Sequence, residues 1–326
     1  MLLFICIALV VFYFLVDWLI HLPKVDGYRN KYVFVTGCDS GFGRDLVIQL
    51  DKLGFPVFAG CLTKTGHDYL RSTCSIRLVT LTVDVTDNAS IQSAYKTIHT
   101  HIPKDGVLWA VVNNAGVTGK LSVSEMCTRK DYSQACEVNL FGPIEVSRVF
   151  MPLLRKSKGR LVNMVSVMGR CPTVSGPYSV SKFGMEAFSD VLRREVAPFG
   201  VKVVVIEPGF FKTTLFNTEF VAREFQNWYD QSSDEVREAY GKDYVSNSTN
   251  VFKGICTTLN EDTDKVIDAY IQAITAKYPK ARYLVGFDAK FIYVPLYHLP
   301  EWLMDLIIEK RSKHLANIGS KIKPSK

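Results

Sequence analysis

A glycine-rich turn joins an apolar strand to a helix near the start of this 326-residue chain. Residues 32–36 read YVFVT, the next seven read GCDSGFG, and an amphipathic helix is expected over 43–53. In such a turn Gly37 permits the tight reversal, Gly41 lets the backbone approach a pyrophosphate, and Gly43 lets the helix pack closely on the strand. The N–H groups and the dipole of the helix N-terminus favour a bound phosphate. The turn therefore predicts a nucleotide-binding strand–helix unit.

Short apolar segments alternate with longer amphipathic segments along the body of the chain. The pattern predicts strands over 32–36, 56–61, 78–83, 108–113, 160–166, 201–207 and 282–285. It predicts helices over 43–53, 91–101, 129–155, 178–197 and 264–276. Near-continuous apolar runs such as VKVVVI are typical of parallel strands that are buried on both faces. We therefore expect an α/β fold, a Rossmann-type doubly wound parallel sheet of about seven strands.

The positive charge of the chain is concentrated in its tail. The formal net charge is +7, and residues 309–326 hold six Lys or Arg against one Glu. The body is therefore close to neutral, which argues against a nucleic-acid partner. The eight cysteines form no CxxC pair and no Cys/His metal spacing. We expect free thiols and no metal site.

The first sixteen residues are apolar without a break, and no Lys or Arg precedes Lys24. Twenty helical residues span about 30 Å, the thickness of a bilayer core. Residues 1–22 therefore predict a single retained membrane anchor rather than a cleaved signal. Lys24, Arg29 and Lys31 after it favour a cytosolic body, whereas the sequons at Asn88 and Asn247 could be used only in the lumen. The sequence leaves the orientation open.

Two further segments interrupt the alternating pattern. Residues 210–260 are rich in aromatic residues and follow the sixth predicted strand, where a long insertion is usually functional, so we expect a helical substrate lid. Residues 291–326 combine apolar and aromatic residues with the basic tail, which favours an interfacial, membrane-associated segment. The predicted division is an anchor over 1–22, a catalytic domain over 30–290 that contains the lid, and the segment 291–326.

Two residues with acid–base chemistry lie four apart on a predicted helix. Tyr178 and Lys182 therefore share one face of that helix. A free phenol has a pKa near 10, and a neighbouring ammonium is expected to lower it. Tyr178 could then accept the proton of a substrate hydroxyl, and a hydroxyl such as that of Ser166 could stabilise charge that develops on the substrate oxygen.

Five motifs in this order resemble those of the short-chain dehydrogenase/reductase superfamily. They are TGCDSGFG at 36–43, NNAG at 113–116, VNLFG at 138–142, a serine at 166 followed by YSVSK at 178–182, and PG at 208–209 with Thr213 four residues later. TVDVTD, FGVKVVVIEPGFFKT and RYLVGFDAKFIYVPL are similar to the retinol dehydrogenase and 17-beta-hydroxysteroid dehydrogenase type 6-like branch. The resemblance covers nearly the whole chain.

The resemblance implies a catalytic set of Tyr178, Lys182, Ser166 and Asn139. Tyr178 would be the general acid–base, Lys182 would also hold the nicotinamide ribose, and Asn139 would hold a water that passes protons to solvent. The implied cofactor-binding residues, besides Tyr178 and Lys182, are Gly37, Asp39, Ser40, Gly41, Phe42, Gly43, Asp84, Asn113, Ala115, Gly116, Pro208, Gly209 and Thr213.

The choice of cofactor depends on charge near the adenosine ribose, where an acidic residue favours NAD and a basic residue accommodates NADP. Ser40 stands where many NADP-using relatives carry Lys or Arg, and Asp39 adds a negative charge beside it. The second predicted strand ends in Gly-Cys-Leu, with Lys64 two residues further on. By resemblance, Asp84 contacts the adenine. We expect NAD, with NADP as the less favoured cofactor.

The resemblance implies an enzyme of the endoplasmic reticulum membrane that oxidises a lipophilic alcohol, retinol or a hydroxysteroid. An apolar pocket discriminates weakly among apolar substrates, so the sequence does not choose between these two. One alternative is a dehydrogenase of a small hydroxy acid such as 3-hydroxybutyrate, for which Lys212 is the candidate cationic clamp. Another is a non-catalytic lipid-binding scaffold with the same fold. Whether the chain forms a homodimer is also left open.

Overall fold

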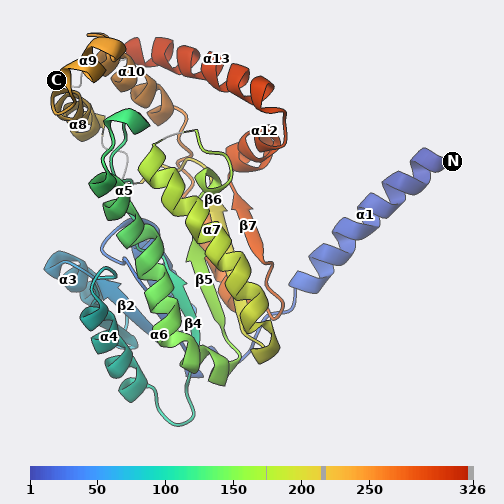
Figure 1. The fold of residues 1–326 in the computed structure, drawn as a ribbon. Coiled ribbons are helices and arrows are strands. Elements are labelled where there is room, and N and C mark those ends of the chain that lie inside the picture. The colour runs from blue at the N-terminus through green and yellow to red at the C-terminus, as the bar shows by residue number, and fades with distance from the viewer. Residues whose placement is uncertain (174, 214–217, 322–326) are drawn as a thin grey trace.

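The computed structural model describes residues 1–173, 175–213 and 218–321, and its centre is a parallel sheet (Figure 1). The strand order is β3-β2-β1-β4-β5-β6-β7, and every neighbouring pair is parallel. This confirms the predicted doubly wound sheet. The strands are β1 (Lys31–Val35), β2 (Val57–Cys61), β3 (Leu78–Thr82), β4 (Val107–Asn113), β5 (Arg160–Met164), β6 (Lys202–Pro208) and β7 (Arg282–Val285).

Helices cover both faces of the sheet, which explains why its strands are apolar throughout. One core layer lies under α2 (Gly41–Lys52), α3 (Lys64–Thr73) and α11 (Asp264–Thr275). The other lies under α4 (Asn88–His101) and α6 (Gly142–Ser157). On that second side α7 (Gly176–Val196) packs through Met185, and α5 (Arg129–Cys136) packs on α7. The sequence did not predict α3.

The order of the strands reverses at β1, because β2 and β3 follow on one side of it and β4 to β7 on the other, with all strands parallel. In a doubly wound sheet, ligands bind outside the carboxyl ends of the strands at this switch point. The glycine-rich turn after β1 and the NNAG segment after β4 therefore meet at one edge of the sheet.

The insertion after β6 forms helices, as predicted, and they stand above that edge (Figure 1). α8 (Thr218–Asp230) and α10 (Tyr244–Cys256) share an apolar cluster of Val221, Phe225 and Phe252, and α9 (Asp234–Tyr240) connects them. We call these three helices the lid.

The C-terminal segment packs against the lid. It contains α12 (Val294–Tyr297), which follows a π-helical turn over Ala289–Tyr293, and then α13 (Glu301–Ser320). A Cβ at Gly254 of α10 or Gly319 of α13 would lie closer than 3.0 Å to the backbone of the other helix. The two helices therefore touch backbone to backbone, and part of the segment predicted as membrane-associated is a support for the lid.

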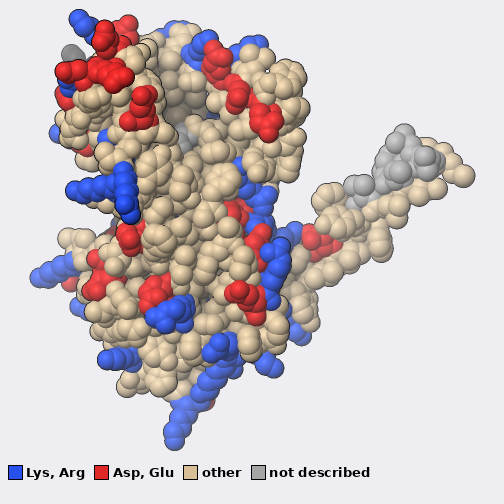
Figure 2. Space-filling model, viewed as in Figure 1, with Lys and Arg blue, Asp and Glu red and all other residues tan. Residues whose placement is uncertain are grey.

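The N-terminal helix α1 (Leu2–His21) projects away from the body (Figure 1). Its base is fixed where Val25 N–H donates to Thr275 and Lys277 N–H donates to Pro23, over 2.8 and 2.7 Å. The side chains of α1 visible in Figure 2 are almost all uncharged. Within residues 1–173, 175–213 and 218–321, no helix combines the length and hydropathy needed to cross a bilayer. The membrane anchor over 1–22 stays a prediction.

Candidate active site

The glycine-rich turn has the conformation that its glycines predict. Gly37 and Gly41 have φ values of +69° and +58°, which favour glycine. A Cβ at Gly37 would lie 2.6 Å from Cα of Ala115, so the first glycine lets the NNAG segment approach. No atom lies within 4 Å of a Cβ built on Gly41. The backbone at Gly41, the first residue of α2, therefore faces open space where a pyrophosphate fits.

Two residues that belong to the quoted motifs, but that were not predicted as site residues, hold the turn. The Asn114 amide donates to the carbonyls of Thr36 and Gly37, both over 3.0 Å, and accepts from the Tyr270 hydroxyl over 3.0 Å. The Thr36 hydroxyl accepts from the backbone N–H of Asn114 and of Ala115, each over 3.1 Å. The turn is thus cross-linked to the segment after β4 by side chains as well as by close packing.

The Asp39 carboxylate is bound by the turn between β2 and α3. It accepts hydrogen bonds from Leu62 N–H over 2.9 Å, and from the N–H and hydroxyl of Thr63 over 2.8 and 2.6 Å. Burial alone would raise the pKa of Asp39, but the hydrogen bonds from Thr63 and Leu62 outweigh it and hold the pKa below its ordinary value. A fixed negative charge therefore stands at the end of β2.

Hydrogen bonds and a ring contact fix three further residues around the cofactor site. Asp84 accepts from the N–H and the hydroxyl of Thr86 over 2.9 and 2.7 Å, which shapes the turn after β3. Phe42 meets Phe211 edge to face, with ring centroids 6.1 Å apart. The N–H of Phe210 donates to Asp288 over 2.7 Å. This carboxylate, which sequence reasoning missed, orients the segment that follows Pro208 and Gly209.

Asn113 and Asn139 lie behind the cavity wall rather than in it. The Asn113 amide donates to Ser147 over 3.1 Å and to Asn163 over 2.9 Å, between β4, β5 and α6. This placement gives no support to the predicted cofactor contact of Asn113. Its neighbour Asn114 lines the cavity instead.

The Asn139 side chain uses its hydrogen-bonding groups within the protein. It accepts from Val117 N–H and donates to the Val117 carbonyl, both over 2.8 Å, and donates to Ser181 over 3.0 Å. Asn139 lies in a π-helical turn (Glu137–Phe141) through which α5 continues directly into α6. The helix predicted over 129–155 is confirmed, with this one wide turn inside it. Such turns accommodate one extra residue and often mark functional sites.

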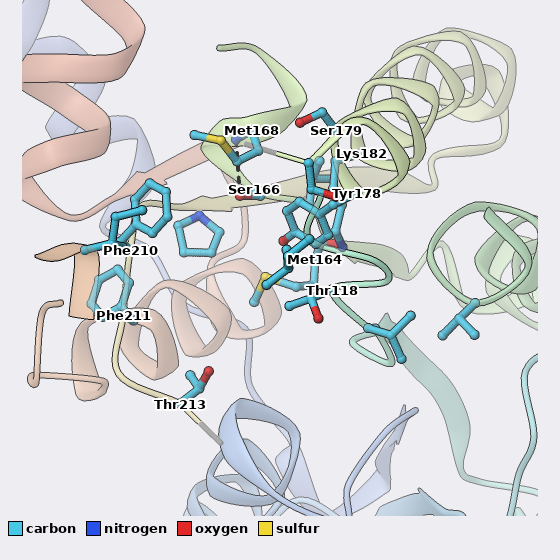
Figure 3. A pocket seen from close by; sticks show the side chains of 18 of the residues that line it. Thr118, Met164, Ser166, Met168, Tyr178, Ser179, Lys182, Phe210, Phe211 and Thr213 are labelled. Carbon is cyan, nitrogen blue, oxygen red and sulfur yellow. Dashed lines mark hydrogen bonds between the residues drawn. The ribbon is translucent and has the colours of Figure 1, made fainter. Parts of the chain in front are cut away.

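Ser166, Tyr178 and Lys182 gather on one side of the cavity (Figure 3). Ser166 caps the short turn after β5, where its hydroxyl accepts from Met168 N–H over 3.2 Å. Lys182 is 3% exposed, and its Nζ donates to the Met164 carbonyl over 3.1 Å. The Lys182 Nζ lies 5.6 Å from the centroid of the Tyr178 ring. One side chain from the turn after β5 and two from α7 thus meet where a substrate oxygen could bind.

The pKa directions correct one expectation. Burial raises the pKa of Tyr178 above its ordinary value, and a hydrogen bond with Ser166 offsets part of this rise. Lys182 does not lower the pKa of Tyr178 as predicted, because burial dominates. Burial also lowers the pKa of Lys182 to about 8, against the opposing charge of Glu186 one turn further along α7. Tyr178 therefore rests as a phenol, a form suited to donating a proton.

A buried cluster of ion pairs joins α7, the helix that carries Tyr178 and Lys182, to the end of β6. Glu207, at the end of β6, is fully buried and accepts from Arg170 over 3.0 Å and from Arg282 over 2.7 Å. Arg282 also pairs with Glu186. Burial beside Glu207 raises the pKa of Glu186 to about 8.

The predicted site residues surround one cavity of about 980 Å³. All of them line it except Gly43, Asn113 and Asn139. The lining continues through Phe210 and Phe211 into the lid, so one space joins the glycine-rich turn to an apolar chamber (Figure 3). Among the described residues that line it, Lys182 is the only Lys or Arg. The residues fit a dinucleotide at one end and a lipophilic molecule at the other.

Comparisons with known proteins agree with this geometry. A family model described as short chain dehydrogenase matches residues 31–224. Retinol dehydrogenase 16 of Rattus norvegicus is 44% identical over 87% of this chain and 89% of its own length. The 17-beta-hydroxysteroid dehydrogenase type 6 of Homo sapiens is 40% identical over 93% of this chain and 95% of its own.

Solved structures share the fold. A short chain dehydrogenase/reductase from Burkholderia phymatum in complex with NAD has a TM-score of 0.67 at 19% identity, over 87% of this chain and 97% of that one. A short chain dehydrogenase from Burkholderia cenocepacia J2315 in complex with NADP has a TM-score of 0.64 at 21% identity, over 86% and 99%. Both cofactors occur among proteins of this fold.

Proposed function

Because this chain belongs to the short chain dehydrogenase family, we propose that it oxidises a lipophilic alcohol with NAD and uses Tyr178 as general acid–base. The observation that carries the proposal is the meeting of Tyr178, Ser166 and Lys182 between the glycine-rich turn and an apolar chamber. The nicotinamide, when bound, supplies the hydride acceptor. The chain's own residues then have to bind the alcohol and take its proton.

Each residue has a defined part in that step. The Ser166 hydroxyl, already hydrogen-bonded to Tyr178, orients the substrate oxygen and stabilises its developing charge. The Tyr178 phenolate accepts the hydroxyl proton during oxidation, and the phenol returns it during reduction. The Lys182 ammonium favours the phenolate as it forms and donates to the ribose. The side chain of Asn139 is already hydrogen-bonded to Val117 and to Ser181 of α7. A water that carries protons would therefore contact the backbone of Asn139.

The chamber favours a retinoid or hydroxysteroid over a small hydroxy acid. It is walled by apolar residues that include Phe210, Phe252 and Val251, and burying apolar surface gives about 25 cal/mol per Å². Lys212, the candidate clamp for a small acid, pairs with Glu261 over 2.8 Å and does not line the cavity. Relatives named for retinol and for 17-beta-hydroxysteroids support the same class. The gathered catalytic side chains argue against a non-catalytic scaffold.

NAD is the proposed cofactor because of charge at the end of β2. The Asp39 carboxylate is held ionised beside Leu62, and both line the cavity. A 2′-phosphate there would meet a fixed negative charge and, within the described lining, no cation other than Lys182.

We place the protein at the endoplasmic reticulum membrane. The support is the apolar helix α1 together with exposed aromatic side chains at Phe291, Tyr297 and Trp302 in the segment 291–326, which are suited to the headgroup region. A lipophilic substrate partitions into the same bilayer. A homodimer stays a prediction.

The test uses the full chain purified in detergent, with NAD or NADP, and follows NADH or NADPH formation. Retinol, androstanediol and 3-hydroxybutyrate are compared. We expect turnover of at least one lipophilic alcohol, with higher kcat/KM for NAD than for NADP. Turnover of 3-hydroxybutyrate alone, or of none of the three, contradicts the proposal.

A further inference from the structure

The Asp288 carboxylate is seated in a niche that two glycines leave open. A Cβ at Gly209 or at Gly286 would lie closer than 3.0 Å to an oxygen of this carboxylate. Gly286 directly follows β7 and has a φ of +105°, a value that favours glycine. The turn at Gly286 therefore brings the Asp288 side chain back towards the end of β6.

This carboxylate holds a backbone group in the segment that follows β6. One Asp288 oxygen accepts from Phe210 N–H over 2.7 Å. On either side, Gly209 N–H donates to the Val285 carbonyl and Asn260 N–H donates to the Phe210 carbonyl, each over 2.9 Å. Hydrogen bonds to a charged acceptor are stronger than those between neutral groups. Of these three bonds, only the one to Asp288 has a side-chain acceptor that a substitution can remove.

The segment that Asp288 holds lies beside the catalytic residues. Because β5 and β6 pair in parallel, Ser166 and Pro208 lie at neighbouring strand ends. In the view of Figure 3, Phe210 and Tyr178 lie on opposite sides of Ser166. Hydride transfer requires the reacting atoms of the alcohol and the nicotinamide to come within about 3–3.5 Å of each other. We therefore expect a nicotinamide that reacts with an alcohol at Tyr178 to bind against the segment after β6.

We infer that Asp288 is a positioning residue for the nicotinamide half of the cofactor, and that it acts through Phe210 N–H. The inference rests on the proposed function and adds a residue to it. Asp288 is absent from the cavity lining, whereas Pro208, Gly209 and Phe210 are part of it. The carboxylate fixes the backbone of the segment, and the segment determines where the nicotinamide lies relative to Tyr178.

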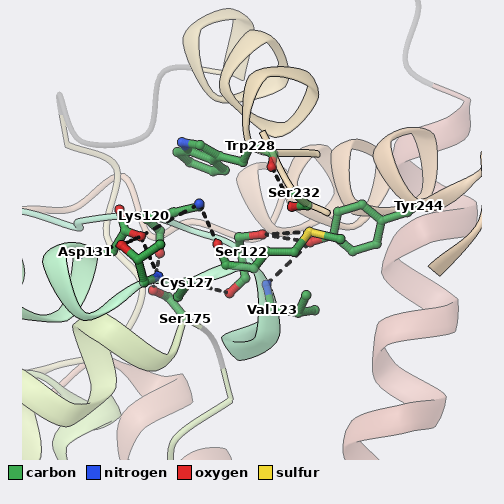
Figure 4. Close-up of polar contacts among 11 residues, drawn as sticks. Lys120, Ser122, Val123, Cys127, Asp131, Ser175, Trp228, Ser232 and Tyr244 are labelled. Atoms are coloured by element: carbon green, nitrogen blue, oxygen red, sulfur yellow. Dashed lines mark hydrogen bonds and ion pairs between the residues drawn. The ribbon is translucent and has the colours of Figure 1, made fainter. Parts of the chain in front are cut away.

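The same segment leads into the lid, which offers a second way for Asp288 to act. The lid has a further attachment at the start of α10 (Figure 4). There the Tyr244 hydroxyl is 3.1 Å from the Ser122 hydroxyl and accepts from Val123 N–H over 3.4 Å. Tyr244→Phe removes this attachment and leaves Asp288 in place. Comparing the two positions thus separates placement of the nicotinamide from attachment of the lid.

The test compares the binding of NADH with that of ADP-ribose, which lacks the nicotinamide ring, by calorimetry on the full chain in detergent. In Asp288→Ala we expect the Kd of NADH to rise about tenfold and the Kd of ADP-ribose to stay within about threefold. The kcat for the best alcohol should fall by about ten- to hundredfold, because a small misplacement of the reacting atoms is costly. Asp288→Asn keeps an acceptor oxygen in a side chain of the same shape, so both Kd values should stay within about threefold of the unaltered protein.

Two controls and one further variant complete the experiment. Tyr244→Phe should leave the ratio of the two Kd values unchanged. Asp51→Ala removes a comparable bond, because the Asp51 carboxylate accepts from Ser75 N–H over 2.8 Å away from the cavity lining, and it should lower the stability without moving the ratio. Asp288→Glu displaces the carboxylate by one methylene group. It should raise the Kd of NADH selectively, and it covers the case in which Asp288→Ala folds poorly.

Three results would overturn the inference. The first is an equal change, or no change, in the two Kd values of Asp288→Ala. The second is an Asp288→Asn variant as impaired as Asp288→Ala, and the third is a shift of the ratio in Tyr244→Phe as large as in Asp288→Ala. An unaltered protein that binds NADH more tightly than ADP-ribose but oxidises no lipophilic alcohol contradicts the proposed function, while the two Kd values still test Asp288.

Discussion

Gly43 is the residue of the glycine-rich turn at which one added methyl group should do the most damage. A Cβ there would lie closer than 3.0 Å to the Asn114 amide nitrogen and to the Gly37 carbonyl oxygen. The Asn114 amide cannot move without losing its hydrogen bonds to the carbonyls of Thr36 and Gly37. Gly43→Ala should therefore loosen the contact between the turn after β1 and the segment after β4.

The size of the effect follows from three contributions. Two lost hydrogen bonds destabilise the fold by about 0.5–1.5 kcal/mol each. Overpacking against the backbone adds about 1–3 kcal/mol. The better helix propensity of alanine returns up to about 1 kcal/mol. These ranges centre on a net loss of about 3 kcal/mol. With about 2.1 cal/mol/K of unfolding entropy per residue, that loss lowers the Tm of a chain of this size by roughly 4 °C.

The assay is calorimetry together with NADH binding measured by fluorescence. Gly184→Ala is the control, because the atoms nearest to a Cβ there are side-chain atoms of Leu140, whose end can move. We expect Gly43→Ala to lower the Tm and weaken NADH binding relative to Gly184→Ala. Equal Tm values and equal NADH affinities for the two variants would refute the argument.

Three other outcomes follow from the structure. Asp39→Asn should lower the NAD-to-NADP ratio of kcat/KM by about tenfold, because it removes the charge held at the end of β2, and an unchanged ratio would count against Asp39. The pKa of Lys182 is about 8 in the fold against an ordinary 10.5, so the unfolded chain binds more protons between these values and this group's contribution to stability rises with pH there. Urea midpoints at pH 8 and pH 10 should show that rise less in Lys182→Met than in the unaltered protein. Arg160→Met should destabilise the fold by about 3 kcal/mol in urea unfolding. Buried Arg160 donates to three carbonyls at the end of α11, and its guanidinium carbon lies 4.0 Å from the centroid of the Trp109 ring. A loss below about 1 kcal/mol would show that water replaces these hydrogen bonds.

The sheet and the turn after β1 were predictable because their signals are local. Apolar β-branched runs and glycine spacing act over a few residues, and the strand over 282–285 was predicted to the residue. Helical spacing predicted that Tyr178 and Lys182 share a face, whereas Ser166 was assigned from the resemblance to the short-chain dehydrogenase/reductase superfamily. The π-helical turn at Asn139 was not predictable, since the hydrogen bonds of its side chain go to Val117, 22 residues earlier in the chain, and leave no local pattern.

Asn113 and Asn114 are placed differently because neighbours in sequence face opposite sides of a strand end. Asn113 and Asn114 have the same chemistry, yet Asn113 turns into the core and Asn114 towards the glycine-rich turn. The pKa of Tyr178 was predicted in the wrong direction because sequence spacing reports the nearness of Lys182 but not the burial of both groups. Contacts such as Ser122 with Tyr244 join residues far apart in the chain and leave no local pattern.

The general acid–base role of Tyr178 is the central claim, and Tyr178→Phe tests it most directly. The variant removes only the hydroxyl, so the folded protein should still bind NADH, as fluorescence would show. The measurement is kcat/KM for oxidation of the best lipophilic alcohol with NAD, beside the unaltered enzyme. We expect a loss of about 10²–10⁴-fold, the usual contribution of a general acid–base. Retention of kcat/KM within about tenfold, with NADH binding intact, would contradict the account.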